Sequence, residues 1–151
     1  MKLPEDKTVQ LTVFSLPAHL PVVRAATERM CQLIGFDADA AGKIVLSVDE
    51  AMTNIIKHAY QGADDKPIEI HLTPIRHRGR KGLRICLRDY GRVVDRSRIR
   101  SRDLADVRPG GLGVHIMSEC MDQVDYRAAE GGGTLLTMLK LLASPEEGKS
   151  E

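Results

Sequence analysis

Short stretches of alternating apolar and polar residues recur along the chain, but they do not alternate regularly with helical segments. Such stretches are typical of strands with one face toward a core and the other toward solvent. They occur near residues 9–13, 68–72, 83–87, 124–128 and 135–141. Two helical segments in succession separate the first stretch from the second. This order favours an α+β fold: a two-layer α/β sandwich with a mixed, mainly antiparallel sheet and helices on one face.

Helical patterns and glycines set the expected boundaries of the other elements. A first helix is expected to end near Ile34, because Gly35 follows its last apolar position. Asp37 or Asp39 can cap a second helix that runs to about Tyr60. Four further segments are expected: a basic connection between strands, a long loop, a third helix and a glycine-rich hairpin turn, over residues 76–82, 89–113, 112–121 and 131–133.

The composition fits one domain with its own core. The chain has 151 residues, of which 42% are hydrophobic, and this is enough for a core without cross-links. We expect the domain over residues 1–143 and a disordered tail over residues 144–151. No apolar run of about 18 residues is present, so no membrane span is expected. Without a recognisable secretory signal or a CxxC pair, the sequence favours a cytoplasmic protein with reduced thiols.

Basic residues gather in one part of the sequence, although the net charge is only +1. The segment from Arg76 to Arg108 holds 12 basic and 4 acidic side chains. Such a band can attract nucleotide phosphates, an acidic protein surface or nucleic acid, and it can also be a solvated hairpin and loop. We expect no nucleic-acid partner, because Tyr90 is the only aromatic residue among those arginines and base stacking is therefore poorly provided for.

The segment from Ile44 to Gln61 has an informative amphipathic pattern. At about 100° per residue, its apolar side chains fall on one side of a helix and its polar side chains on the other. Glu50 and Asn54 lie on the polar side, one helical turn apart, and are close enough to serve one ligand. Asn54 is a poor residue for a helix interior, and its amide oxygen is a suitable Mg²⁺ ligand. A solvated polar face explains the same pattern.

The other polar residues of this segment carry weaker signals. Lys57 and Tyr60 are expected to be ordinary surface residues. His58 either contacts a phosphate group or is a hydrogen-bonded structural histidine, and the pattern does not separate these two roles.

Three further motifs gain meaning when considered together with this helix. Asp89 ends a predicted strand, where its carboxylate can accept a hydrogen bond from an adenine amino group, and Gly91 allows the base to lie close. Residues 109–113 (Pro-Gly-Gly-Leu-Gly) open a predicted helix whose free N–H groups can bind phosphate. Thr134 begins the last strand, where its hydroxyl can assist at the base. A common turn, a flexible hinge and a hairpin turn are the respective alternatives.

Together these motifs resemble those of the gyrase, chaperone and histidine-kinase ATPase superfamily. Residues 50–60 (Glu-Ala-Met-Thr-Asn-Ile-Ile-Lys-His-Ala-Tyr) resemble its N-box, and residues 89–91 and 110–113 resemble its two glycine boxes. The similarity is strongest to the bacterial anti-sigma-factor serine kinases, over about residues 9–141. Residues 121–126 (Met-Asp-Gln-Val-Asp-Tyr) match their Met-Asp-x-Val-x-Tyr pattern. The resemblance implies a Bergerat-type ATP-binding fold.

The resemblance also implies a role for each matching residue. Asn54 would coordinate Mg²⁺ on the ATP phosphates, and Glu50 would act as general base on a serine hydroxyl. Asp89 and Gly91 would bind the adenine, and residues 92–110 would form a lid. The other implied ATP contacts come from the N-box, the second glycine box and the last strand: His58, Gly111, Leu112, Gly113 and Thr134.

The function implied by the resemblance is an ATP-dependent serine-protein kinase that acts as an anti-sigma factor by partner switching. Such proteins phosphorylate a serine on an antagonist protein, alternatively bind a sigma factor or other regulator, and are usually homodimers. This sequence departs from many members at Val93, which replaces the second glycine of the first glycine box. The departure motivates an alternative: an ATP-binding module that sequesters a sigma factor or another regulator without significant kinase activity.

Overall fold

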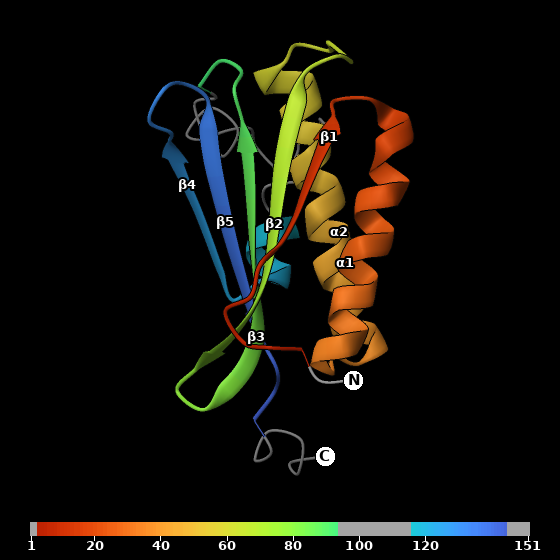
Figure 1. Cartoon of the computed structure of the whole chain (residues 1–151), viewed down its shortest axis with the longest axis vertical. Coiled ribbons are helices and arrows are strands. Elements are labelled where there is room, and N and C mark those ends of the chain that lie inside the picture. Colours follow the sequence, from red (N-terminus) through yellow and green to blue (C-terminus); the bar gives the residue numbers. More distant parts are fainter. Residues whose placement is uncertain (1–2, 94–115, 145–151) are drawn as a thin grey trace.

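A computed structural model describes residues 3–93 and 116–144, which form a five-stranded sheet and a layer of helices (Figure 1). The strands are β1 (Val9–Phe14), β2 (Pro67–His77), β3 (Arg80–Asp89), β4 (Gln123–Ala128) and β5 (Thr134–Leu141). The helical elements are η1 (Pro17–His19), α1 (Leu20–Ile34), α2 (Ala38–Asn54) and η2 (Ile55–Ala59), of which η2 is a π-helical turn. Residues 116–120 are also helical.

The strands are ordered β1-β2-β3-β5-β4, and each neighbouring pair is antiparallel. The helical hairpin of α1 and α2 returns the chain to the end of the sheet where β1 finished, so Pro67 at the start of β2 pairs with Phe14. The predicted α+β class is confirmed, with α1 and α2 on one face (Figure 1). The expectation of a mixed sheet was wrong for the described strands, because a two-helix connection places β2 antiparallel to β1.

The core lies between the sheet and the two helices. Alternate residues of β2 and β3 face it and are fully buried, as Ile68, Ile70 and Leu87 illustrate. From the helices, Val23 and Met52 complete the same cluster. Burying one such side chain contributes about 1.5–3 kcal/mol, so these strands hold the ends of the sheet in fixed positions.

The hairpin between β2 and β3 is tighter than the sequence suggested. The predicted basic connection over residues 76–82 was wrong, because both strands continue through it and Arg76 pairs with Lys81. Only Arg78 and Gly79 form the turn, and both have positive φ angles, of 52° and 80°. Two consecutive residues with positive φ are the signature of a type I′ turn, which suits the twist of a hairpin.

Several other boundaries are as predicted. The helix α1 ends before Gly35, whose φ is 112°, and Asp37 caps α2 by accepting a hydrogen bond of 2.8 Å from the N–H of Ala40. The three glycines at residues 131–133 form the turn between β4 and β5 with positive φ. The cysteines are unpaired thiols, as expected.

Some predictions fall partly or wholly on residues 94–115 and 145–151. These are most of the long loop, the lid, the start of the third helix and the tail, and they lie outside the described residues. Within the described ranges, no helix has both the length and the apolar character to cross a membrane.

Candidate functional site

The predicted site residues that the structure describes gather at one end of the sheet. The helix α2 ends there at Asn54, β3 ends there at Asp89, and β5 begins there at Thr134. Figure 1 shows these ends side by side, at the top of the molecule. A pocket lies between them, lined by the polar residues Asn54, Asp89 and Thr134 together with Ala51, Ile55, Ala59, Tyr126 and Leu136.

The helix that carries Asn54 changes its geometry immediately after this residue. Residues Ile55–Ala59 form a π-helical turn, in which the N–H of Tyr60 donates to the carbonyl oxygen of Ile55 at 2.9 Å. The helical segment therefore ends about where it was predicted to end, but its last turn does not have the assumed value of about 100° per residue. Such turns add one residue to a helical turn and are frequent at functional sites. Here the turn begins at the pocket.

Asn54 is buried instead of lying on a solvated face. Only 7% of its surface is exposed, and both atoms of its side-chain amide lack a hydrogen-bond partner in the described part of the chain. The hydroxyl oxygen of Thr134, on the opposite wall, is buried and unpartnered in the same way. Buried polar groups are almost always paired. Unpaired groups that line one pocket therefore indicate a ligand site.

Asp89 supplies a buried carboxyl group to the same pocket. It is 3% exposed, and its Oδ1 accepts a hydrogen bond of 3.0 Å from the N–H of Gly91. Burial raises the pKa of Asp89, whereas backbone hydrogen bonds from Gly91 and Thr134 act in the opposite direction. The carboxylate is thus held in place with capacity to accept a further donor.

Two glycines allow backbone segments to approach closely around Asp89. A Cβ atom on Gly91 would lie 2.3 Å from the carbonyl oxygen of Ala59. On the other side, a Cβ atom on Gly133 would lie 2.0 Å from the carbonyl oxygen of Asp89 itself. Neither position has room for a side chain, so Gly91 has a packing role in addition to the predicted contact with a base.

The remaining predicted residues are placed less directly. Glu50 lies one turn before Asn54 on α2, is half-buried and does not line the pocket. His58 lies in the π-helical turn and is half-buried. Gly111, Leu112 and Gly113 lie outside the described residues.

Tyr60 is a site residue that the sequence analysis missed. It was expected at the surface but is only 8% exposed. Its hydroxyl accepts a hydrogen bond of 2.8 Å from the N–H of Tyr90 and donates one to the carbonyl oxygen of Pro67. The extra residue of the π-helical turn rotates Tyr60 by about 100° toward the core. No simple periodicity in the sequence signals this turn.

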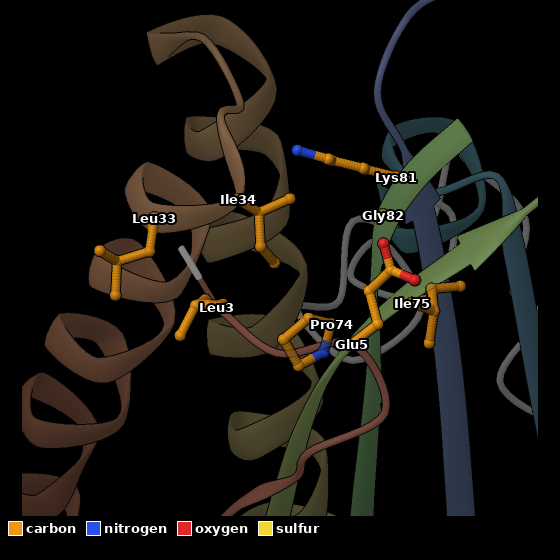
Figure 2. A pocket seen from close by; sticks show the side chains of 8 residues that line it. All are labelled: Leu3, Glu5, Leu33, Ile34, Pro74, Ile75, Lys81 and Gly82. Carbon is orange, nitrogen blue, oxygen red and sulfur yellow. The ribbon is translucent and has the colours of Figure 1, made fainter. Parts of the chain in front are cut away.

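A second cavity lies at the opposite end of the sheet (Figure 2). Its walls are mainly apolar, and Glu5 and Lys81 are its charged members; the other lining residues are Leu3, Leu33, Ile34, Pro74, Ile75 and Gly82. No buried side-chain atom of these residues lacks a hydrogen-bond partner in the described ranges. This cavity therefore lacks the unpaired polar groups that distinguish the first pocket.

The chemistry of the first pocket fits an adenine nucleotide with a magnesium ion. The amide oxygen of Asn54 is a hard ligand of the kind that Mg²⁺ accepts, and the carboxylate of Asp89 can accept an amino group. In the described segments, no cluster of three or more histidine, cysteine or acidic residues could hold a metal by itself. Magnesium commonly keeps phosphate oxygens and waters among its ligands, so a single amide is compatible with this fit.

The comparison with known families agrees with this chemistry. A sequence profile of the histidine kinase-like ATPase domain matches residues 13–140, which is most of the chain. The chain belongs to the histidine kinase-like ATPase domain family. The predicted resemblance is thereby confirmed, and membership in an ATPase family supports ATP as the ligand.

Individual relatives of this ATPase domain carry a more specific name. This chain is 27% identical to serine-protein kinase RsbW of Halalkalibacterium halodurans, over 97% of this chain and 90% of that protein. It is 24% identical to serine-protein kinase RsbW of Bacillus subtilis, over 89% of this chain and 85% of that protein. The similarity thus extends over nearly the full length of both kinases.

Two solved structures share the fold of this ATPase domain. The structure of the RsbU and RsbW domains of a Mycobacterium tuberculosis protein superposes with a TM-score of 0.65 at 18% identity, over 92% of this chain and 33% of that longer chain. The SiaB-SiaC complex from Pseudomonas aeruginosa gives a TM-score of 0.56 at 10% identity, over 87% and 88% of the two chains. At such identities the likeness concerns the fold.

Proposed function

We propose that the protein is an ATP-dependent serine-protein kinase that acts as an anti-sigma factor by partner switching and phosphorylates a serine on an antagonist protein. The names of its relatives support the kinase activity. The single observation that carries the proposal is the pocket in which the unpaired amide of Asn54 and the buried carboxyl of Asp89 meet. This combination suits a ligand with an amino-bearing base at one end and magnesium-bound phosphates at the other.

The nucleotide would lie across the end of the sheet. Asp89 would accept the adenine amino group, with Thr134 offering its hydroxyl and Gly91 keeping the strand end tight. Asn54 would hold Mg²⁺, which supplies positive charge to the phosphates when bound. Further phosphate contacts are proposed for His58 and for the second glycine box: Gly111, Leu112 and Gly113.

Glu50 is the proposed general base. It lies on the same helix as Asn54, one turn earlier, so a serine hydroxyl close to the nucleotide phosphates would be within its reach. The carboxylate would accept the serine proton while the serine oxygen bonds to the γ-phosphorus and the bond to the ADP oxygen breaks. Such proton transfer typically accelerates a reaction by about 10²–10⁴-fold.

The proposed cellular setting follows from the same assignment. The antagonist protein would be the phosphorylated partner, and a sigma factor or other regulator would be the alternative partner of a cytoplasmic homodimer. Nucleotide state would then select between the two partners.

Mixing the protein with MgATP and an antagonist domain encoded by a neighbouring gene tests the proposal. We expect Glu50→Gln to bind MgATP as the wild type does but to lose phosphate transfer by about 10²-fold or more. Asp49→Asn is the matched control, because Asp49 is the adjacent carboxylate and instead contacts Arg24 at 3.0 Å. Undiminished transfer by Glu50→Gln, or an equal loss in the control, would remove Glu50 from this role.

A further inference from the structure

A set of contacts joins the π-helical turn to the segment that follows β3. The N–H of Tyr90 donates to the hydroxyl of Tyr60 at 2.8 Å. Two residues further on, Arg92 donates from its backbone N–H to the carbonyl oxygen of Ala59 at 3.1 Å and from its Nε to that of His58 at 2.8 Å. Between these contacts, Gly91 packs directly on Ala59. The two segments are therefore fixed against each other.

These contacts lie beside two proposed ligand-binding groups on different elements. Asn54 directly precedes the π-helical turn, and Asp89 directly precedes Tyr90. The backbone route between Asn54 and Asp89 along the chain is long, because it passes through β2 and β3. The Tyr60 hydroxyl provides a shorter route. This route follows the π-helical turn from Asn54 to Tyr60, crosses the hydrogen bond to Tyr90 and returns one residue to Asp89. The hydroxyl thereby ties together the two segments that carry these groups.

The hydroxyl of Tyr60 is suited to a fixed bridge. It donates to the carbonyl oxygen of Pro67 while it accepts from Tyr90, so both of its hydrogen-bonding functions are used. Burial raises its pKa, and the phenol therefore stays protonated at neutral pH. Buried hydrogen bonds with both functions satisfied restrict the side chain to one position.

We propose that the Tyr60 hydroxyl is a positioning group that holds Asn54 and Asp89 at the separation required by one nucleoside triphosphate. This inference rests on the proposed nucleotide site. In this arrangement Tyr60 contacts neither the adenine nor the phosphates of the nucleotide. It acts through the two segments that it joins, which carry Asn54 and Asp89. A ligand that uses both ends gains from their fixed spacing, because ordering costs are met before binding. A ligand that uses only one end gains nothing from it.

Adenosine and MgATP separate these two cases. Adenosine reaches only the Asp89 end, whereas MgATP engages both ends. Tyr60→Phe keeps the ring and removes only the hydroxyl. We expect this variant to bind MgATP about 5- to 10-fold more weakly, the effect of losing the one hydrogen bond that joins Tyr60 to Tyr90. Its affinity for adenosine should change by less than about 2-fold.

Tyr90→Phe is the matched control, because it also removes one tyrosine hydroxyl at the same strand end. That hydroxyl donates to the surface carboxylate of Glu69, at 3.0 Å, and the backbone N–H of Tyr90 is retained. We expect the control to bind both ligands like the wild type.

Calorimetry for MgATP and ligand-observed NMR for adenosine give the two affinities. Equal weakening of both ligands by Tyr60→Phe would assign the hydroxyl a general structural role and overturn the inference, as would unchanged MgATP binding. If Tyr60→Phe does not fold, the hydroxyl has a general structural role, and the inference is overturned in the same way. Failure of the wild type to bind either ligand would instead refute the proposed function itself, and the positioning role with it.

Discussion

The two ends of the sheet differ in how their polar groups are satisfied. At the end with the π-helical turn, the amide of Asn54 and the hydroxyl of Thr134 are buried without partners in the described part of the chain. At the other end, Arg76 contacts Glu5 at 2.8 Å. There Arg80 donates to the carbonyl oxygen of Leu142, at 2.9 and 2.6 Å. The polar groups of one end are satisfied by its own contacts, whereas we propose that those of the other end are satisfied by a ligand.

We interpret this difference as a loss of stability that is accepted for ligand binding. A buried polar group without a partner costs about 1–3 kcal/mol. Such costs are typical of binding sites, where a ligand later supplies the missing partner. The end with the β2–β3 hairpin carries no comparable cost among the residues described, and we assign it a structural role.

Alanine substitutions at two glycines should give the largest contrast in stability between the ends. Gly133 at the pocket and Gly79 in the β2–β3 hairpin have nearly equal φ angles, of 79° and 80°. They differ in space, because a Cβ on Gly133 would meet the carbonyl oxygen of Asp89 at 2.0 Å, whereas one on Gly79 would meet nothing within 4 Å. We expect Gly79→Ala to lower the free energy of unfolding by about 1 kcal/mol and Gly133→Ala by about 3 kcal/mol or more.

Urea denaturation of both variants provides this comparison. Because the backbone strain is shared, the difference between the two variants reports the close approach at the pocket alone. Similar losses in the two variants would show that the backbone at the pocket end can move apart easily, contrary to this account.

A smaller effect is expected from the pH dependence of stability. Burial raises the pKa of Asp89 in the folded state, so the folded protein holds this proton more tightly than the unfolded chain does. The stabilising contribution is therefore complete below the unfolded pKa of about 4 and is lost as the pH rises through the folded pKa. At pH 7 ionisation of this carboxyl is less favourable in the folded protein than in the unfolded chain, so Asp89→Asn should raise the free energy of unfolding there.

Denaturation curves between about pH 2 and about pH 7, values on either side of the usual aspartate range, measure this effect. The advantage of Asp89→Asn should shrink as the pH falls and disappear at the acidic limit. The control is Asp122→Asn at the other end, whose exposed carboxylate accepts a hydrogen bond of 2.8 Å from the N–H of Leu141. This control should show no gain at pH 7; an equal gain in both variants would contradict the assigned cause.

The sequence alone predicted those parts of the fold that depend on regular periodicity. Alternation located all five described strands, and the stop at Gly35 and the cap at Asp37 followed from local chemistry. It did not predict that β2 and β3 continue to Arg78 and Gly79, because the charged residues there suggested a loop. In the structure, Arg76 pairs with Lys81 and His77 pairs with Arg80 across the hairpin.

The site was predicted less completely, for a physical reason. Helical arithmetic assumes a constant 100° per residue, and the π-helical turn after Asn54 breaks that assumption. Tyr60, which follows this turn, was therefore expected at the surface, whereas it is buried. Asn54 precedes the turn, and its burial excludes the alternative of a solvated face. The motif order still indicated that Asn54 and Asp89 belong to one site, and the structure places both on one pocket. The roles proposed for Glu50 and the second glycine box stay predictions.

The central claim is that MgATP binds at the pocket end through Asn54. Calorimetric titration of the wild type and Asn54→Ala, each with and without magnesium, tests it most directly. Arg76→Ala, which removes the exposed contacts with Glu5 and with the carbonyl oxygen of Gly79 at the other end, is the control and should cost at most about 1 kcal/mol of stability.

We expect the wild type to bind MgATP more tightly than ATP alone. Asn54→Ala should bind MgATP about 10- to 100-fold more weakly, in line with the loss of a contact to a charged group, and should no longer respond to magnesium. Arg76→Ala should bind as the wild type does. Failure of the wild type to bind MgATP at millimolar concentration, or full magnesium-dependent binding by Asn54→Ala, would contradict the account.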